Sequence, residues 1–398
     1  MLKRENIVIY GACAAGEAAL AACTSKGLHV LCFCDDSEEK NSGTFCGYPV
    51  RAYKEICSHH GMDFFLIIAV SGLDSILFEL KNANRQNRFA TIECVLNDFD
   101  INSHVFASCS TYRGRFETKT CLDYHRAVSQ QAFFIKSLDI VITERCSLRC
   151  AHCSNLMQYY QHPKDFHVDS ITRDVEKVLG VVDGICEVRI LGGEPFLHKG
   201  LSRIVDTIAA RNHGGNIAIY TNGTILPNDD LIRSAQRTNT ACIVSDYGAL
   251  SRNLDKVIAV LQKNNVAHWV HRPEEWMSCS TLHKWNRSRE QSMATLENCC
   301  VKHLTTMIDG KIYRCPFIGN AMNLEAIPHT REDGIALDAL SSLPKGEARE
   351  ILQAFLLQKE VSSCDYCAGR PFQGGKAVPP AVQIAAPIPY EKCGSRIA

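Results

Sequence analysis

An alternation of short apolar strands with amphipathic helical stretches, beginning near residue 136, most strongly limits what this chain can fold into. The expected strands are Leu138–Thr143, Glu187–Leu191, Asn216–Tyr220, Ala241–Ser245 and Val266–Val270. Helical patterns lie between them, for example over Asp169–Leu179, Leu201–Arg211 and Leu254–Lys263. Such alternation predicts an α/β fold with a parallel sheet. Five or six repeats predict a full or partial TIM-like barrel, with functional groups in the loops that follow the strands.

Two flanking regions show different patterns, so we expect three domains and a linker in the 398 residues. Residues 1–105 alternate strands and helices, with strands expected over Asn6–Gly11, Leu28–Asp36, Asp63–Val70 and Phe89–Asp98. Residues 106–135 are interpreted as the linker, and residues 136–295 form the strand–helix series. Residues 296–398 predict a small α+β domain, with a hairpin turning at Asp309-Gly310 and a helix over Lys345–Gln358.

Composition narrows the classes of protein. Lys plus Arg and Asp plus Glu both number 43, and this zero formal charge argues against a nucleic-acid binder. The longest apolar run, Phe64–Val70, is far shorter than the roughly 20 residues that span a bilayer. The first residues lack a signal-peptide pattern, so we expect a cytoplasmic protein without a membrane partner. In a reducing compartment, clustered members of its 21 cysteines indicate metal binding or catalysis.

Three cysteines crowd the stretch ERCSLRCAHCSN, Glu144–Asn155, directly after the first strand of the series. Cys146, Cys150 and Cys153 have the spacing C-x3-C-x2-C. A structural zinc ion needs four ligands, whereas a [4Fe–4S] cluster takes one thiolate per iron. Three thiolates would therefore leave one iron open to another molecule. A zinc site with a distant fourth ligand and a redox cysteine group are the alternatives.

The loop and its position after the first strand resemble the signature of the radical S-adenosylmethionine (radical SAM) superfamily. This resemblance implies a partial (β/α)6 radical SAM barrel, with S-adenosylmethionine bound to the open iron of a [4Fe–4S] cluster. It also implies one-electron cleavage of S-adenosylmethionine to methionine and a 5′-deoxyadenosyl radical that abstracts hydrogen. The family usually has an aromatic residue before the third cysteine, and His152 stands there in this chain.

Three further motifs end successive strands, and they resemble motifs of the same family. In ILGGEPFL, Ile190–Leu197, Gly192 and Gly193 would let the backbone approach the S-adenosylmethionine amino group, and Glu194 would accept from it. Asn222 in YTNGT would contact the ribose or the carboxylate, and Ser245 in VSDYG would contact the ribose. Each motif alone is compatible with an ordinary turn, but their order at the strand ends is specific.

A second group of cysteines lies beyond the strand–helix series. It comprises Cys299, Cys300, Cys315, Cys364 and Cys367. Four thiolates complete the ligand set of a second [4Fe–4S] cluster, and only one of Cys299 and Cys300 is needed. The arrangement resembles the twitch domain, a shortened relative of the SPASM extension found after radical SAM barrels. Structural zinc is the alternative, because a four-thiolate set with a C-x2-C arm suits zinc equally well.

The N-terminal stretch IVIYGACAAGEAAL lies between an expected strand and an expected helix. Gly11 and Gly16 match two glycines of the G-x-G-x-x-G dinucleotide fingerprint, while Cys13 replaces the central one. The next strand ends in Asp35 and Asp36. The region resembles the Rossmann-like N-terminal domain of sialic-acid-type and bacillosamine acyltransferases, which implies nucleotide or nucleotide-sugar binding. A docking or oligomerising domain is the alternative.

These resemblances predict an oxidoreductase-like radical SAM enzyme that acts on a carbohydrate or nucleotide sugar in glycoconjugate or natural-product biosynthesis. The expected outcome is dehydrogenation, epimerisation or dehydration, with flavodoxin or ferredoxin as electron donor. One alternative is a radical SAM maturase of a ribosomal peptide. Another is a non-catalytic iron–sulfur or zinc protein that binds a nucleotide. The sequence does not identify a catalytic acid or base.

Overall fold

The structure is a computed structural model, and it divides into two compact units, residues 1–132 and 133–398. It describes residues 5–35, 40, 43–60, 63–70, 76, 88–107, 111–330, 332–371 and 375–393. Each unit contains its own sheet and its own hydrophobic core. Among the described residues no helix is long and apolar enough to cross a membrane.

The first unit is built on a six-stranded sheet in the order β3-β4-β2-β1-β5-β6. Its strands are β1 (Asn6–Tyr10), β2 (His29–Cys34), β3 (Thr44–Phe45), β4 (Tyr48–Arg51), β5 (Phe65–Ile68) and β6 (Phe89–Thr91). Only β3 is antiparallel to its neighbour. Alternate side chains of β1 enter different cores, with Ile7 and Ile9 on one face and Val8 on the other. The strands are therefore apolar on both faces, as parallel strands covered by helices are.

The helices of this unit correct the expected linker over residues 106–135. They are α1 (Ala14–Ser25), α2 (Tyr53–His60), α4 (Glu93–Leu96) and α5 (Thr111–Ser129). Helix α5 packs against α1 and buries Cys121 and Leu122 in the same core as Ile7. Most residues of α5 are polar, so its sequence alone does not predict this packing. The division of the chain falls after it, between Ala132 and Phe133.

The second unit is built on an eight-stranded sheet in the order β11-β10-β9-β8-β7-β13-β14-β15. Its strands are β7 (Phe134–Val141), β8 (Gly184–Leu191), β9 (Asn216–Thr221), β10 (Ala241–Ser245), β11 (His268–His271), β13 (Leu304–Ile308), β14 (Lys311–Tyr313) and β15 (Gly334–Ala336). The first six of these run parallel to one another. Strand β14 is antiparallel to β13, and β15 is antiparallel to β14. The mixed α/β architecture with parallel sheets is confirmed.

Strand β13 continues the sheet on the far side of β7. Thr306 pairs with Asp139, so the hairpin expected in a separate C-terminal domain extends the main sheet instead. Residues 133–398 consequently form one unit, without the division expected at residue 295. The pairing joins residues far apart in the sequence, and strand patterns alone do not report such pairs.

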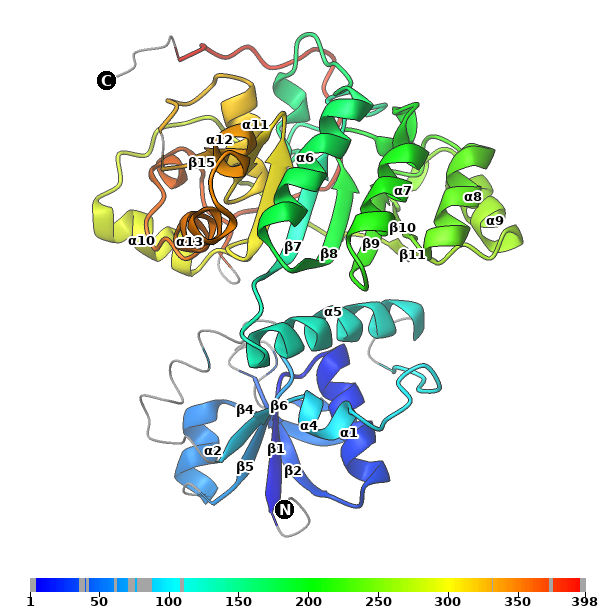
Figure 1. Ribbon diagram of the computed structural model, residues 1–398, viewed down its shortest axis with the longest axis vertical. Helices are drawn as coiled ribbons and strands as arrows, with labels where there is room; N and C mark the ends of the chain where they lie inside the picture. Colours follow the sequence, from blue (N-terminus) through cyan, green and yellow to red (C-terminus); the bar gives the residue numbers. More distant parts are fainter. Residues whose placement is uncertain are drawn as a thin grey trace. The chain divides into compact units, whose positions relative to one another are not determined.

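Helices α6 (Val168–Val181), α7 (Leu201–Arg211), α8 (Asp229–Thr238) and α9 (Leu254–Lys263) lie in a row over one face of this sheet (Figure 1). Ile140 and Val188 of the strands share a core with Val175 and Ile204 of the helices. Asn228 caps α8 by accepting a hydrogen bond from the Leu231 amide at 2.8 Å.

The remaining elements in the described part of the second unit are short 3₁₀ turns, one pair of two-residue strands and four helices toward the C-terminal end of the sequence. They are the 3₁₀ turns Met157–Tyr159, Pro195–Leu197, Gly248–Leu250 and Ser362–Tyr366, the pair β12 (Trp276–Met277) and β16 (Ala377–Val378), and α10 (Arg289–Glu297), α11 (Pro316–Asn323), α12 (Leu337–Ser341) and α13 (Lys345–Leu356). A capping box of Ser288 and Gln291 starts α10.

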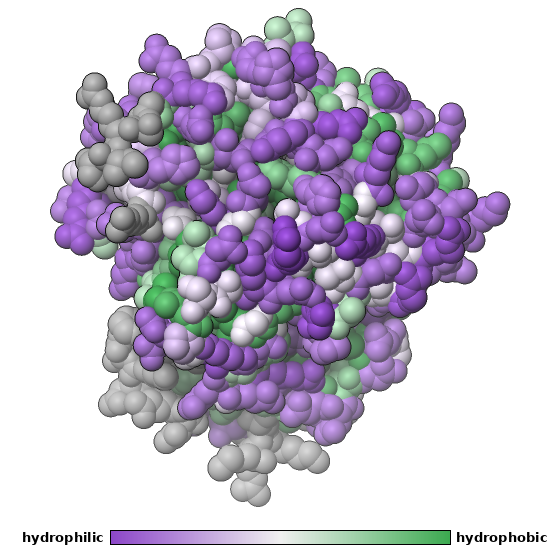
Figure 2. Space-filling model, turned by 45° about the horizontal axis from the view of Figure 1, so that its top comes forward, coloured by the Kyte–Doolittle hydropathy of each residue, from purple (hydrophilic) through white to green (hydrophobic). Residues whose placement is uncertain are grey.

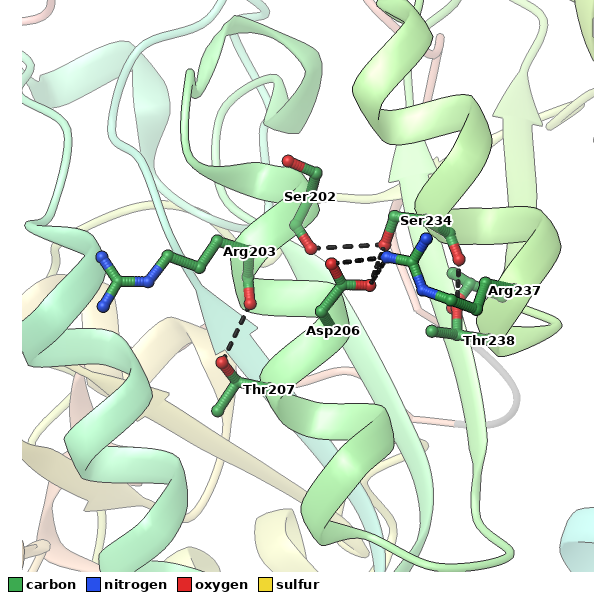
Figure 3. A network of polar contacts seen from close by, with 8 residues as sticks. Ser202, Arg203, Asp206, Thr207, Ser234, Arg237 and Thr238 are labelled. Atoms are coloured by element: carbon green, nitrogen blue, oxygen red, sulfur yellow. Dashed lines mark hydrogen bonds and ion pairs between the residues drawn. The ribbon is translucent and has the colours of Figure 1, made fainter.

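Polar contacts join neighbouring helices of the row at their solvent side. Asp206 of α7 accepts hydrogen bonds from Arg237 and Ser234 of α8, both at 2.7 Å (Figure 3). Figure 2 shows that the visible face of the molecule is mostly hydrophilic, with apolar side chains in small separate areas. Neither the Asp206 contacts nor the surface hydropathy indicates a functional site. Most of the predicted site residues lie at the ends of strands or in the loops that follow them.

Candidate active site

The three-cysteine loop follows β7, and the C-terminal segment of the chain closes over it. Cys150 forms a β-bridge with Gln383, and the Ala151 amide donates to the Val382 carbonyl at 2.7 Å. The Gln383 side chain donates to the Cys150 thiol at 3.2 Å and accepts from the Arg149 amide at 2.8 Å. The sequence pattern did not predict this contact, which joins residues far apart in the chain.

The first cysteine group, Cys146, Cys150 and Cys153, is largely enclosed. Burial raises the pKa of Cys146 to about 12 and that of Cys150 to about 11, and the neighbouring Cys153 thiol adds to both shifts. Asn222 donates from Nδ2 to the Cys146 thiol at 3.6 Å, within the range for sulfur acceptors. Donors aimed at sulfur and low solvent access are the features that tune bound iron–sulfur clusters, so the group fits such a cluster.

The donor set also bears on the type of metal. Among the described residues, no three His, Cys, Asp or Glu side chains converge on a point that could hold a single ion. A cluster spreads its thiolates over different irons, whereas zinc needs all its thiolates about 2.3 Å from one point. This finding applies to both cysteine groups alike, so the metal in each group is identified by measuring iron and zinc.

Gly193 lets the loop after β8 lie directly against the start of the cysteine loop. A Cβ atom on Gly193 would lie 2.1 Å from the Arg145 carbonyl oxygen. The Gly193 amide donates to Thr143 O and the Glu194 amide to Arg145 O, both at 2.8 Å. The glycine is thus required for loop-to-loop packing, and its approach to S-adenosylmethionine stays a prediction.

The Glu194 carboxylate joins the ends of β8 and β9. It is fully buried and accepts from the Phe196 amide at 3.0 Å, and from Thr221 Oγ1 and the Asn222 amide at 2.8 Å. Burial raises the pKa of Glu194 to about 7, although these hydrogen bonds act to lower it. Three donors from the chain already use this carboxylate, so its first role here is to hold Asn222 near the cysteine loop. Its contact with a ligand amine stays a prediction.

We expect Glu194→Gln to destabilise the protein by about 1–3 kcal/mol, because the amide nitrogen would face a backbone donor in a buried site. The free energy of unfolding, measured with denaturant, gives the value. Glu297→Gln, at an exposed position of α10, is the matched control and should have little effect. Equal losses in both variants would contradict the role of Glu194.

The ends of β9 and β10 are also joined, through Ser251. Its hydroxyl donates to the Asn222 carbonyl at 2.8 Å and to the Ser245 carbonyl at 3.0 Å. Burial raises the pKa of Tyr247, and the three thiols of the first cysteine group raise it further, so this ring lies near them. His152 is half-buried in the cysteine loop. Tyr247 was missed because a single tyrosine after a strand carries no signal.

The sheet face opposite the helices carries a row of polar side chains across three strands. Asp139 of β7 lies between Thr306 of β13 and Arg189 of β8 in the sheet register. The Arg189 guanidinium lies 3.0 Å from the Asp139 carboxylate and 4.6 Å from the centre of the Tyr220 ring. Thr306 Oγ1 is buried and has no hydrogen-bond partner among the described residues. Buried polar groups are normally paired, so Thr306 is an exception on this face.

The second cysteine group gathers four of the five predicted thiols. Burial is the main cause that raises the pKa of Cys364 and Cys367 to about 12, and the Cys299 thiol contributes to both shifts. Cys299 and Cys364 likewise raise the pKa of Cys315. Cys300 is exposed. The lower exposure of Cys299 and its effect on the pKa values of the other thiols favour Cys299 over Cys300, and we name Cys299, Cys315, Cys364 and Cys367 the second cysteine group.

Residues outside the predicted set also lie at the second group. Arg287 donates to the carbonyls of Cys364 and Cys367, both at 2.9 Å, which fixes the C-x2-C turn. The Cys367 thiol contacts the carbonyl of the buried Cys279 at 3.6 Å. Sequence analysis missed Arg287 and Cys279 because neither belongs to a spaced motif.

The first unit holds the predicted nucleotide-binding residues in a tight turn. The Ala12 amide and the Lys40 ammonium both donate to Asp35 at 3.1 Å. A Cβ atom on Gly16 would lie 1.9 Å from the Gly11 carbonyl oxygen, so helix α1 and strand β1 meet closely there. Asp36 lies outside the described residues. Nucleotide binding at this turn stays a prediction.

A depression of about 710 Å³ lies elsewhere on the first unit. Its lining includes Glu17, Leu20, Thr24, Cys46, Phe99 and His104, and none of the predicted nucleotide-binding residues. The Glu17 carboxylate is buried and accepts from the Ala107 amide at 2.5 Å. This carboxylate therefore serves the packing of the unit.

Residues 140–245 match the family model of the radical SAM superfamily. The matched segment runs from β7 to the end of β10, and it contains the first cysteine group, Gly193, Glu194 and Asn222. In sequence, this part of the chain is therefore similar to proteins of the radical SAM superfamily. The superfamily implies S-adenosylmethionine and one [4Fe–4S] cluster for the matched segment.

Curated relatives are similar over part of the chain. GTP 3′,8-cyclase of Stenotrophomonas maltophilia is 40% identical over 93 residues, which are 23% of this chain and 27% of the relative. GTP 3′,8-cyclase of Streptomyces coelicolor is 36% identical over 120 residues, 30% of this chain and 32% of the relative. The chain thus spans only about a quarter to a third of the length of these relatives.

Solved structures show weaker likenesses. A structure of BtrN with AdoMet and 2-DOIA has a TM-score of 0.38 and 12% identity, over 58% of this chain and 92% of that chain. Streptococcus suis SuiB bound to S-adenosylmethionine has a TM-score of 0.31 and 12% identity, over 65% of this chain and 54% of that chain. Neither likeness carries the argument, which depends on the residues and on the family match.

Proposed function

We propose that this chain is a radical SAM enzyme whose first cysteine group holds the cluster that binds S-adenosylmethionine. The supporting observation is that three thiols on one loop, Gly193 and Asn222 follow three adjacent parallel strands, within the matched segment. When bound there, the cluster and S-adenosylmethionine supply a 5′-deoxyadenosyl radical that takes hydrogen from a C–H bond.

The chain's own residues hold and shield this site. Asn222 and Gln383 donate to the thiols of Cys146 and Cys150, which stabilises negative charge on sulfur. The segment around Val382 covers the cysteine loop and limits access of water. Glu194 fixes Asn222 through the backbone amide. These contacts orient the ligands before S-adenosylmethionine binds, which is a requirement for precise radical chemistry.

We propose a small polar substrate that binds at the polar sheet face. Arg189, Asp139 and Thr306 offer donors and acceptors there, as a ligand with several hydroxyls requires. Carbohydrates and nucleotide sugars, expected from the sequence, meet this requirement. The names of the relatives favour a nucleoside triphosphate, GTP, which also carries ribose hydroxyls. GTP and nucleotide sugars are therefore the first substrates to screen.

We propose in addition that the second cysteine group holds an auxiliary [4Fe–4S] cluster. Its four thiols would supply one ligand for each iron, so this cluster would carry electrons and bind no S-adenosylmethionine. An electron acceptor beside the substrate supports dehydrogenation of an alcohol to a carbonyl. A cyclisation, as in the names of the relatives, is the alternative outcome. Flavodoxin or ferredoxin is the proposed electron donor.

The test is the reductive cleavage of S-adenosylmethionine. Anaerobically reconstituted protein is incubated with S-adenosylmethionine and dithionite, and 5′-deoxyadenosine is measured by chromatography with mass detection. We expect 5′-deoxyadenosine, and more of it with the correct substrate from the panel. Its absence from protein that contains a full complement of iron would overturn the proposal and favour a non-catalytic iron–sulfur protein.

A further inference from the structure

Arg370 lies in the segment that follows Cys367, and this segment also contacts the turn at Cys299 and Cys300. The Gly369 amide donates to the Cys367 thiol at 3.3 Å, and the Cys300 amide donates to the Arg370 carbonyl at 2.8 Å. Pro371 forms a β-bridge with Cys299. The backbone of Arg370 is thus fixed from both sides, next to thiols that the proposed function assigns to a cluster.

The Arg370 side chain differs from the other arginines at this site. Arg287 donates to the Cys364 and Cys367 carbonyls, and Arg314 donates to the Phe355 and Gln358 carbonyls at 3.0 Å. Arg370 Nε is buried, and among the described residues it has no hydrogen-bond partner. A buried donor on a cation costs free energy unless something negative lies beside it.

The backbone contacts therefore decide where the charge of Arg370 lies. They hold Arg370 beside Cys367 on one side and beside Cys299 and Cys300 on the other. The cation is thus fixed at the second cysteine group, where the negative charge of bound thiolates would be concentrated.

We propose that Arg370 is a positioning residue whose guanidinium compensates the thiolate charge and raises the reduction potential of the cluster in the second cysteine group. This inference rests on the proposed function. Reduction adds one electron to that cluster, and a neighbouring cation stabilises the added negative charge. In the proposed dehydrogenation the electron comes from the substrate radical, which also loses a proton to become the oxidised product. Arg370 thus favours transfer of the electron from the substrate to the second cluster.

The test compares reduction potentials in the anaerobically loaded full chain. Arg370→Gln removes the charge, Arg370→Lys keeps it, and Arg289→Gln removes an exposed charge that pairs with Glu360. Iron content is measured first, and the midpoint potential of the second cluster is then determined by EPR-monitored redox titration. We expect a lower potential for Arg370→Gln at unchanged iron, and wild-type behaviour for Arg370→Lys and Arg289→Gln.

Each other outcome is decisive as well. A wild-type potential for Arg370→Gln with full iron overturns the inference and leaves the proposed function intact. If Arg370→Gln loses iron from the second group, Arg370→Lys decides, because a charge role requires its potential to match the wild type. If the wild-type protein holds one cluster only, the auxiliary cluster and this inference are both overturned, while 5′-deoxyadenosine formation still tests the first cluster.

Discussion

Replacing Cys146, Cys150 and Cys153 together by alanine should remove the first cluster and reduce 5′-deoxyadenosine formation to the level of the protein-free control. The three thiols are the donors that the structure gathers on the loop after β7, and each is needed to bind a separate iron. The remaining cluster, if the second cysteine group holds one, has no open iron for S-adenosylmethionine. Iron is measured per chain by a colorimetric assay, and the nucleoside is measured after reduction.

Cys94→Ala is the matched control for this variant. Cys94 is exposed on α4 of the first unit and belongs to neither cysteine group. Its replacement should change neither iron content nor turnover. If the triple variant still cleaved S-adenosylmethionine, the first cysteine group would not be the cluster site, and the assignment of the loop would fail. A circular dichroism spectrum like that of the wild type shows that the fold survives.

The parallel strands of the second unit could be predicted because each of them is a short run of mostly apolar residues. Strands β9 and β10 begin at the predicted residues, Asn216 and Ala241, and β10 also ends where predicted, at Ser245. Strand β8 begins at Gly184, before the predicted Glu187, because Ile185 and Cys186 are buried as well. Local pattern is enough where each strand pairs with the next one along the chain.

Contacts between distant parts of the chain could not be predicted in this way. Strand β13 pairs with β7, and Gln383 reaches Cys150 across more than two hundred residues. Helix α5 was taken as a linker because its polar face masks Leu122. Each of these contacts depends on where two segments meet in space, and a single sequence contains no signal of that.

The positions of the candidate site residues were easier to predict than their contacts. Gly193, Glu194 and Asn222, which were predicted from spacing and strand ends, lie beside the cysteine loop. The expected partner was S-adenosylmethionine, yet the hydrogen bonds of Glu194 go to Phe196 and to β9 and its following loop. A motif thus marks a place in the fold, while its partners depend on packing that the motif does not describe.

Single replacements in the second cysteine group should divide into two classes. Alanine at Cys299, Cys315, Cys364 or Cys367 should lower iron from about eight to about four atoms per chain, because a four-iron cluster needs all four thiolates. Alanine at Cys300 should leave the iron unchanged, since that side chain is exposed and is not among the causes of the raised pKa values of Cys315, Cys364 and Cys367. Cys300 is an internal control, because it is adjacent to Cys299 in the same turn. Iron and zinc are both measured per chain by plasma emission.

The two metals give different patterns, and these decide the chemistry. If the wild type contains about four irons and one zinc, with zinc lost on replacing Cys364, the second cysteine group is a structural zinc site. An electron acceptor would then be missing beside the substrate, and a redox-neutral reaction such as cyclisation or epimerisation would be favoured over dehydrogenation. If iron falls by half and 5′-deoxyadenosine still forms, the first cluster works alone, and the second acts after hydrogen abstraction. Loss of iron in Cys300→Ala with retention in Cys299→Ala would reverse the ligand assignment, because the thiol that binds the metal cannot be the one that is dispensable.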